Sequence, residues 1–456
     1  MTRYGLLRLA HAVVLTTILM FHATGVSGQK LSDDQIKIAA SATPMQAKAA
    51  REFFRKHGNV RFFGYSNYQP KILHLRDPKL RDEAIGPLQY LVGLEELYLA
   101  GLPISDEGLK SLKGLRNLKS LVLSGPSRSG SASETPPVTM KLNGSGLQVV
   151  AKLPQLEKLW LNRLPIDAKH LNAFSHATKL REIWLSSAAS DGRLSTLGPE
   201  LLALQEVPNL RLLRVMVRHD VRKSPEEKPL HKLSGPLFAK WKSSATLKHL
   251  VLSGVELDSK AWASLQKFRS LESLEYRVPT SEIDWETLSK LPNLRQIRLA
   301  GVADKALVGI EKCKQIRSLR LEFSITDEGL ASLTGLSNLQ SLSLWYCPVT
   351  GQSLKDGERM KSLKTLRLTG SKWDDQGLKK LASLPALHSI DLERTRVTTK
   401  GLKLLPDIET LRKVVPPIPW DDSGTGVSDP ETIRVIEELR KQAPHIEFKM
   451  KLDVPS

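Results

Sequence analysis

Leucines recur along this chain at a fixed spacing. A unit that begins at Leu91, LVGLEELYLAGLPISDEGLKSLKG, restarts at Leu115 as LRNLKSLVLSG, 24 residues later. The same phase returns at Leu153, Leu247, Leu291, Cys313, Leu336, Met360 and Leu384, with weaker copies at TKLREIWLSS, VPNLRLLRVMV and FRSLESLEYRV. Self-similarity at one period is the signature of a repeat array, and we count about a dozen units.

Each unit predicts a short strand, a turn and a short helix. The strand lies at the LxL core, where successive side chains point to opposite faces and the leucines face inward. Ser105 and Thr326 begin the segments SDEGL and TDEGL, and their hydroxyl oxygens are suited to capping a helix N-terminus. No unit can bury its apolar face alone, so the units are expected to stack as a parallel sheet on one side and helices on the other.

The repeat LxLxx(T/S/C)x(I/V)TDEGLxxL resembles that of the leucine-rich-repeat family, in the form found in its secreted bacterial members. The resemblance covers roughly residues 71–415. It implies an α/β leucine-rich-repeat solenoid, a horseshoe with a parallel concave sheet and short convex helices. A solenoid of this kind offers an extended concave surface for binding.

Both ends of a repeat stack expose an apolar cross-section, and the chain supplies a candidate cap for each. Residues 29–70 form the predicted N-terminal cap, with an amphipathic helix over residues 46–57. Residues 416–456 form a linker and the C-terminal cap, because the prolines of PPIPW exclude a repeat there. We expect a helix that starts near Ser428 and carries Ile433, Ile436 and Leu439, followed by a last strand over residues 446–448.

Residues 1–28 are predicted to be a signal peptide. Arg3 and Arg8 make a basic start, residues 12–21 are apolar, and small residues precede Gly28. The alternative is a membrane anchor, but this apolar stretch is shorter than the roughly 20 residues needed to cross a bilayer. We therefore expect the mature protein to be secreted or periplasmic.

Composition and charge add two expectations. With 41% hydrophobic and 25% charged residues, the chain can bury a large core. A formal charge of +19 favours acidic partners or surfaces, although it is also compatible with a solvated, Lys-rich exterior. Cys313 and Cys347 are too few for a disulfide framework. Both are expected to be buried small residues, and Cys347 stands where the family usually places Asn or Cys to bond the turn backbone.

The motifs of catalysis are missing from the sequence. It contains no GxSxG, HExxH, GxxxxGK(S/T) or CxxC, and its histidines lack metal-ligand spacing. Asp421 and Asp422 could form a carboxylate pair, but exposed acids beside a linker are the simpler interpretation. We expect no enzyme, no cofactor and no metal, while a catalytic site assembled from distant residues stays open as an alternative.

The residue between the two leucines of each LxL points out of the core. Along the chain these residues are His74, Tyr98, Val122, Trp160, Trp184, Arg214, Val251, Glu275, Arg298, Arg320, Ser343, Arg367 and Asp391. The aromatic stretch Tyr98, Trp160 and Trp184 is the predicted recognition centre, since Trp and Tyr bring large contact areas. The predicted ligand-binding arginines are Arg214, Arg298, Arg320 and Arg367. The alternatives are that the aromatic rings pack laterally and that nearby carboxylates, such as Glu275 and Glu322, neutralise the arginines.

Long insertions follow the strand in three units, after Gly125, Ser186 and Val217, and are expected on one edge of the sheet. The combined prediction is a secreted, non-catalytic binding protein that recognises a protein, peptide or glycan, possibly acidic, through its concave face. The alternative is a structural or adhesive envelope component that binds acidic surface polymer. An export signal disfavours nucleic acid as the partner.

Overall fold

The computed structural model describes residues 44–57, 60–66, 69–125, 140–164, 166–188, 201–218, 231–233, 245–278, 282–354, 357–417 and 429–449. The chain forms two compact units, Met1–Leu180 and Arg181–Ser456. The predicted signal peptide, Asp421, Asp422 and most of each insertion lie outside the described residues.

The first unit begins with a helix and an antiparallel hairpin. Helix α3 (Pro44–His57) is followed by β1 (Val60–Ser66), which pairs antiparallel with β2 (Gln69–Leu75). From β2 onward the neighbouring strands are parallel: β3 (Glu96–Ala100), β4 (Ser120–Ser124) and β5 (Lys158–Asn162). The helices are α4 (Asp82–Ile85), α5 (Asp106–Lys110), α6 (Ser145–Ala151) and α7 (Ala168–Asn172). The repeat pattern predicts β2 but not β1, which belongs to no repeat.

The second unit continues the parallel order. Its main sheet contains β6 (Glu182–Ala188), β7 (Leu212–Arg218), β9 (His249–Ser253), β11 (Ser273–Arg277), β12 (Gln296–Ala300), β13 (Ser318–Glu322), β14 (Ser341–Trp345), β15 (Thr365–Arg367), β16 (Ser389–Asp391), β17 (Lys413–Val415) and β18 (Glu447–Phe448). A separate parallel pair joins β8 (His231–Leu233) to β10 (Val255–Leu257). The helices are α10 (Ser259–Ser264), α11 (Trp285–Ser289), α12 (Asp327–Ser332), α13 (Asp375–Lys380), α14 (Thr399–Leu402) and α15 (Pro430–Gln442).

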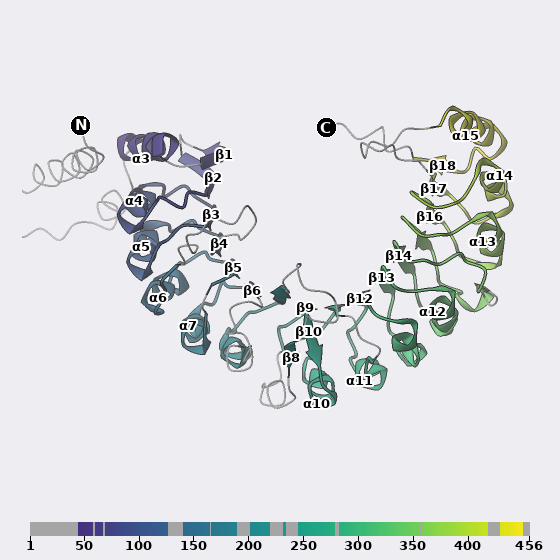
Figure 1. Cartoon of the computed structure of the whole chain (residues 1–456), viewed down its shortest axis with the longest axis horizontal. Helices are drawn as coiled ribbons and strands as arrows, with labels where there is room; N and C mark the ends of the chain where they lie inside the picture. Colours follow the sequence, from purple (N-terminus) through teal and green to yellow (C-terminus); the bar gives the residue numbers. More distant parts are fainter. Residues whose placement is uncertain are drawn as a thin grey trace, which may run out of the picture. The chain divides into compact units, whose positions relative to one another are not determined.

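Within each unit the strands line one side and the helices the other (Figure 1). The LxL leucines face the space between these layers, as Leu319, Leu321, Leu342 and Leu344 show by their complete or near-complete burial. Strand register aligns leucine with leucine, since Leu319 pairs with Leu342 and Leu321 with Leu344. The predicted architecture of a parallel sheet covered by short helices is confirmed in both units.

The TDEGL segment joins each repeat to the one before it. Thr326 caps α12 as predicted, because its side chain accepts a hydrogen bond from the backbone N–H of Glu328. The same threonine donates its backbone N–H and its hydroxyl to the two carboxylate oxygens of Asp304, at 2.9 and 2.5 Å. The relation recurs in other repeats, between the pairs Asp82 and Ser105, Asp327 and Thr350, and Asp375 and Thr398.

The glycine of this segment makes room for that contact. A Cβ atom added to Gly329 would collide with the Asp304 carboxylate, and one added to Gly401 would collide with Asp375. Glycine therefore stands there because the aspartate of the preceding repeat approaches the backbone closely, and its permissive dihedral angles play no part.

Both cysteines are free and buried, as expected. Burial raises the pKa of each thiol to about 12. The thiol of Cys347 donates to the backbone carbonyl of Leu321 at 3.4 Å, so it bonds the backbone near the turn. Both thiols are therefore protonated at neutral pH.

At the end of the second unit, Asp429 caps α15 by accepting from the N–H of Thr432. The buried residues of α15 are Thr432, Val435, Ile436 and Leu439. The expected helix is present and carries Ile433, Ile436 and Leu439, but Ile433 is exposed, because it lies one position away from the 3.6-residue stripe that Val435, Ile436 and Leu439 define. The last strand, β18, pairs parallel with β17.

Candidate functional site

Outward residues of the first unit lie in register across β2 to β5. His74 pairs with Tyr98, Tyr98 with Val122, and Val122 with Trp160. The Tyr98 ring lies 4.0 Å from the His74 ring, and Phe63 of β1 lies on the other side of His74 at 5.3 Å. Val122 is buried although its register position faces outward. The aromatic side chains of this face therefore do pack laterally, in part, while Tyr98 and Trp160 stay half-exposed.

This packing shifts the pKa values of His74 and Tyr98. Burial lowers the pKa of His74; Glu96 opposes that shift and Arg61 adds to it. Burial also raises the pKa of Tyr98, helped by Glu96, whose carboxylate accepts the Tyr98 hydroxyl at 3.3 Å. At neutral pH the face is aromatic and, at His74, uncharged.

In the second unit, Trp184 and Arg214 form a stacked pair. They are register partners on β6 and β7, and the guanidinium carbon of Arg214 lies 4.0 Å from the centroid of the Trp184 ring. Burial lowers the pKa of Arg214. Such a cation–π contact orients both side chains and is worth about 0.5–2 kcal/mol. Trp184 belongs to the second unit, whereas Tyr98 and Trp160 belong to the first.

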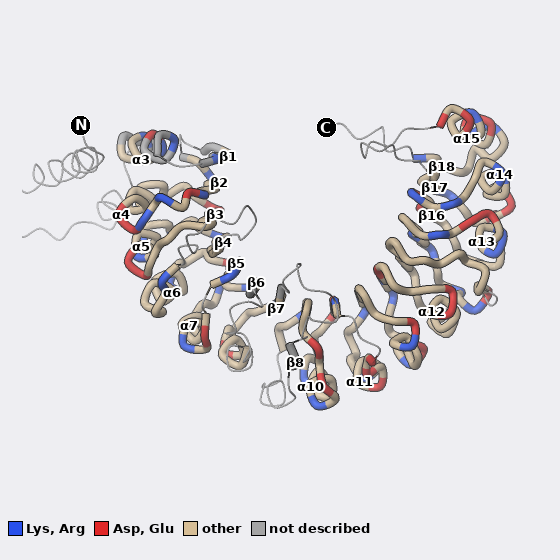
Figure 2. The backbone as a smooth tube through the Cα atoms, viewed as in Figure 1, with Lys and Arg blue, Asp and Glu red and all other residues tan. Residues whose placement is uncertain are grey.

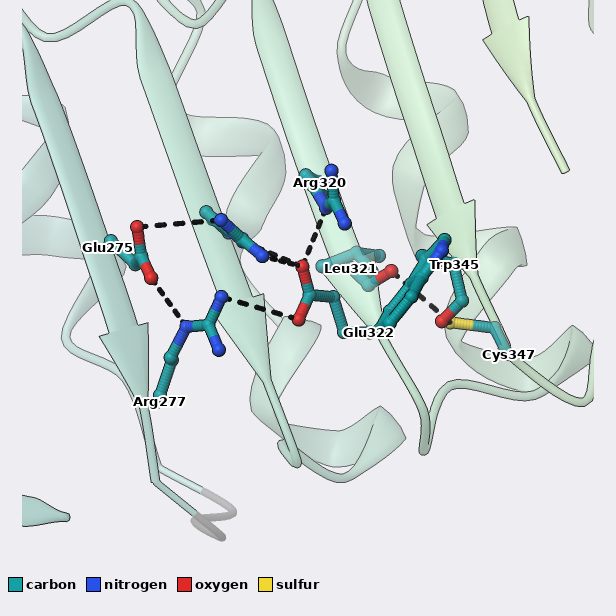
Figure 3. Close-up of polar contacts among 8 residues, drawn as sticks. Glu275, Arg277, Arg320, Leu321, Glu322, Trp345 and Cys347 are labelled. Carbon is teal, nitrogen blue, oxygen red and sulfur yellow. Dashed lines mark hydrogen bonds and ion pairs between the residues drawn. The ribbon is translucent and has the colours of Figure 1, made fainter. Parts of the chain in front are cut away.

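Farther along the same sheet, two glutamates and three arginines form what we call the Glu322 network: Glu275, Arg277, Arg298, Arg320 and Glu322 (Figure 3). One carboxylate oxygen of Glu322 accepts from Nε of Arg298 and from Nε of Arg320, each at 2.6 Å. Its other oxygen lies 3.7 Å from Arg277, which is also hydrogen-bonded to Glu275. Glu322 is 1% exposed, so these contacts compensate a buried charge.

Arg298 and Arg320 are therefore engaged by carboxylates, which is the alternative weighed from the sequence. Each nevertheless keeps about a third of its side chain exposed, at 32% and 38%. Arg367 of β15 is the register partner of Ser343 on β14, and its side chain is exposed. It makes no ion pair with any residue that the structure describes.

An aromatic cluster that the sequence reasoning missed follows β13 and β14. We call Phe323, Trp345 and Tyr346 the edge cluster. The Phe323 and Trp345 ring centroids lie 5.2 Å apart, and those of Trp345 and Tyr346 lie 4.7 Å apart, both edge to face. Arg320 lies over Trp345 at 5.3 Å, and Arg394 contacts both the ring and the hydroxyl of Tyr346. The cluster occupies the two positions after the LxL core, outside the set that strand periodicity selects.

The turn after these strands shows why the cluster is unusual. In other repeats the same position holds Gly101, Gly254, Gly301 and Gly370, with φ between 69° and 77°. Arg163, Phe323, Tyr346 and Arg394 occupy it with φ of 51°, 78°, 50° and 56°. A side chain in this region costs roughly 1–3 kcal/mol, and such strain is concentrated at functional sites. The replacement of a repeated glycine was the signal in the sequence that could have revealed this cluster.

The repeat identifies the fold. Strand after strand places a buried apolar residue on each side of one outward residue, and an aspartate of the preceding repeat bonds Ser105, Thr326, Thr350 and Thr398. Both units therefore have the leucine-rich-repeat fold. Solenoids of stacked repeats present extended surfaces that are used for binding.

Searches of family models and of curated proteins return no match for this leucine-rich-repeat protein. Among solved structures, it is similar to an internalin from Listeria monocytogenes, with 16% identity, a TM-score of 0.38, and coverage of 82% of this chain and 94% of that one. It is also similar to a leucine-rich-repeat protein from Leptospira interrogans, with 16% identity, a TM-score of 0.36, and coverage of 89% and 98%. The repeat assignment rests on the strand register of this chain.

The described residues contain no group of three or more His, Cys, Asp or Glu side chains that could hold a metal ion. A pocket between α6 and the 3-10 helix Ala173–His176 is lined by Lys152, His176 and Lys179 without a carboxylate or cysteine. No helix in the described segments is long and apolar enough to cross a membrane.

Proposed function

We propose that this leucine-rich-repeat protein is exported and binds a protein, peptide or glycan, without catalysing a reaction, through the outward side chains of its strands. The observation that carries the proposal is the pairing of Trp184 with Arg214. Trp and Arg are the residue types most enriched among binding hot spots, and this stack holds both on rigid strands.

The first unit supports the proposal with a second aromatic surface. Tyr98 is held by the His74 ring and the Glu96 carboxylate, so little conformational freedom is lost when a ligand contacts it. Trp160 stands two strands away in the same register, across the buried Val122. Tyr98 and Trp160 would supply contact area in this unit, as Trp184 and Arg214 would in the other.

The later arginines would bias the partner toward acidic groups. Arg298 and Arg320 are positioned by Glu322 but remain partly exposed, and Arg367 is exposed. A charge of +19 would add long-range attraction for acidic partners. Export would follow from residues 1–28, and the resulting location would be extracellular or periplasmic.

The same net charge favours the second candidate, an adhesive protein held to acidic surface polymer. Against it, Figure 2 shows acidic residues interspersed with basic ones on the helices of each unit, so the outer surface is not uniformly cationic. Adhesion by charge alone should weaken steeply with salt, whereas binding centred on aromatic residues should not.

The test is capture of a partner from the native cell-surface fraction by immobilised protein, followed by titration with the captured partner. Trp160→Ala and Trp184→Ala should each weaken affinity roughly thirtyfold, as loss of a hot spot does. Arg367→Ala should mainly change the association rate and its dependence on salt. Unchanged affinity in both tryptophan variants, with unchanged circular dichroism, would show that the partner binds elsewhere.

A further inference from the structure

We infer that the edge cluster and the Glu322 network of the second unit form one binding site for an acidic peptide segment that carries an apolar anchor side chain. The inference rests on the proposed binding function and shares its arginines Arg298 and Arg320, but it is centred on Phe323 and Trp345 rather than on Trp184, and it names the chemistry of the partner.

The two groups of residues are continuous through Arg320. Nε of Arg320 donates to Glu322 at 2.6 Å, while its guanidinium carbon lies 5.3 Å from the Trp345 ring (Figure 3). Trp345 in turn contacts Phe323 and Tyr346. A charged surface and an aromatic surface thus meet at one side chain within a single unit.

The backbone is arranged to display the aromatic rings. Phe323 and Tyr346 take a left-handed conformation where other repeats use glycine, and Phe323 is 49% exposed. The next repeat keeps its glycine: a Cβ atom on Gly370 would collide with the Tyr346 ring. The left-handed backbone at Phe323 and Tyr346 is strained, and the missing side chain at Gly370 leaves room for the Tyr346 ring. Together these features place the Phe323 and Tyr346 rings at the surface, although the core does not need them.

The charged side chains beside the aromatic rings favour an anionic ligand. The network contains three arginines and two glutamates, and the arginine side chains are more exposed than the glutamate side chains. Glu322 is 1% and Glu275 14% exposed, whereas Arg277, Arg298 and Arg320 are each about a third exposed. Within the described residues the two Nη nitrogens of Arg320 have no hydrogen-bond acceptor. A ligand therefore meets N–H donors, which match the geometry of a carboxylate.

The ring geometry favours a peptide over a sugar. The planes of Phe323 and Trp345 meet at 65°, and those of Trp345 and Tyr346 at 83°. Edge-to-face rings present no single flat platform for a pyranose ring, whereas an aliphatic or aromatic side chain can contact their edges and faces. Glutamate or aspartate beside that anchor would reach Arg320 and the exposed Arg367 and Arg394.

The probe is a short fluorescein-labelled peptide in which one leucine is flanked by glutamates, titrated into the full chain by fluorescence anisotropy. A glutamine analogue of the peptide, an all-glutamate analogue and polygalacturonate serve as competitors. The acidic leucine peptide should bind at least roughly tenfold more tightly than either peptide analogue, because charge and anchor both contribute.

Phe323→Gly supplies the discriminating variant, because the turn conformation suits glycine and the fold should persist. It should weaken peptide binding about tenfold or more. Arg163→Gly is the matched control, since Arg163 also has positive φ at the same turn position but lies in the first unit, and its peptide affinity should not change.

Absence of peptide binding, equal binding by Phe323→Gly and wild type, or preference for polygalacturonate would each overturn the inference. The Trp184→Ala capture test reports on the proposed function and the Phe323→Gly titration on this site. Each can fail while the other succeeds.

Discussion

The hydroxyl of Thr326 donates to the carboxylate of Asp304, 22 residues earlier, at 2.5 Å. The same threonine caps its own helix by accepting from Glu328. The Thr326 side chain thus caps the N-terminus of a helix in its own repeat and bonds that repeat to the preceding one. Stability in this chain is therefore carried between neighbouring repeats by polar contacts as well as by packed leucines.

Asp327 tests the strength of this link. Its carboxylate accepts from the N–H and hydroxyl of Thr350, from the N–H of Gly351 and from the hydroxyl of Ser353. Asp327→Ala leaves those donors without their acceptor and should lower the free energy of unfolding by about 2–3 kcal/mol. Urea denaturation followed by circular dichroism measures it. Glu328→Ala, an exposed neighbour, is the control and should change stability by less than about 0.5 kcal/mol.

The same carboxylate predicts a dependence on pH. Burial raises the pKa of Asp327, but the hydrogen bonds from Thr350, Gly351 and Ser353 lower it more, so the net shift is downward. A pKa that is lower in the folded state stabilises the fold above the unfolded value of about 3.9, and this contribution disappears as the pH falls through the folded pKa. The stability difference between wild type and Asp327→Asn should narrow in acid. A constant difference in urea midpoints from neutral pH into acid would contradict this.

Gly329 tests the close approach of neighbouring repeats. Gly329→Ala should destabilise the protein by about 1–3 kcal/mol, because its Cβ would collide with Asp304 and the backbone can move little within a packed stack. Gly86→Ala is the matched control, since nothing lies within 4 Å of its Cβ. Thermal denaturation should show a lower midpoint for the first variant and no loss for the second; equal midpoints would argue against the close contact.

Glu322 tests the compensation of buried charge. Glu322→Gln removes the charge beside Arg298 and Arg320 but keeps an acceptor, and it should destabilise the second unit by about 1–3 kcal/mol, because those arginines remain partly solvated. Glu447→Gln removes an exposed partner of Lys449 and should cost less than about 1 kcal/mol. Chemical denaturation of both variants measures the two losses of stability. Similar losses would show that the Glu322 network is solvated like an exposed ion pair.

Most of the fold could be predicted because it depends on local periodicity. Alternation in the LxL core determines which side chains face inward, and the pairing of Arg298 with Arg320 and of Trp184 with Arg214 follows the predicted register. The hairpin strand β1 could not be predicted, since it belongs to no repeat. The exposure of Ile433 could not be predicted either, because the apolar residues of α15 allow more than one stripe.

The candidate site was only partly predictable for the same reason. Strand alternation states that Arg320 points outward, but not that Glu322 is buried beneath it or that Trp345 lies beside it. The contact with Trp345 joins neighbouring repeats, and the strength of both contacts depends on distances that no spacing in the chain encodes. Nor does the spacing reveal that Val122, an outward position, is buried among its neighbours.

By itself, the sequence determined that leucines face a shared core, that strands run parallel, and that Ser105 and Thr326 begin helices, because these features follow from periods of two and 24 residues along one chain. Only the tertiary structure decided which outward residues cooperate. The side chains that meet at Arg320 come from β11 to β14 and the turns after them, and Phe323 and Tyr346 become prominent through a left-handed turn that stacking maintains. A repeat period predicts which way a side chain points, whereas a binding surface depends on the distances between side chains.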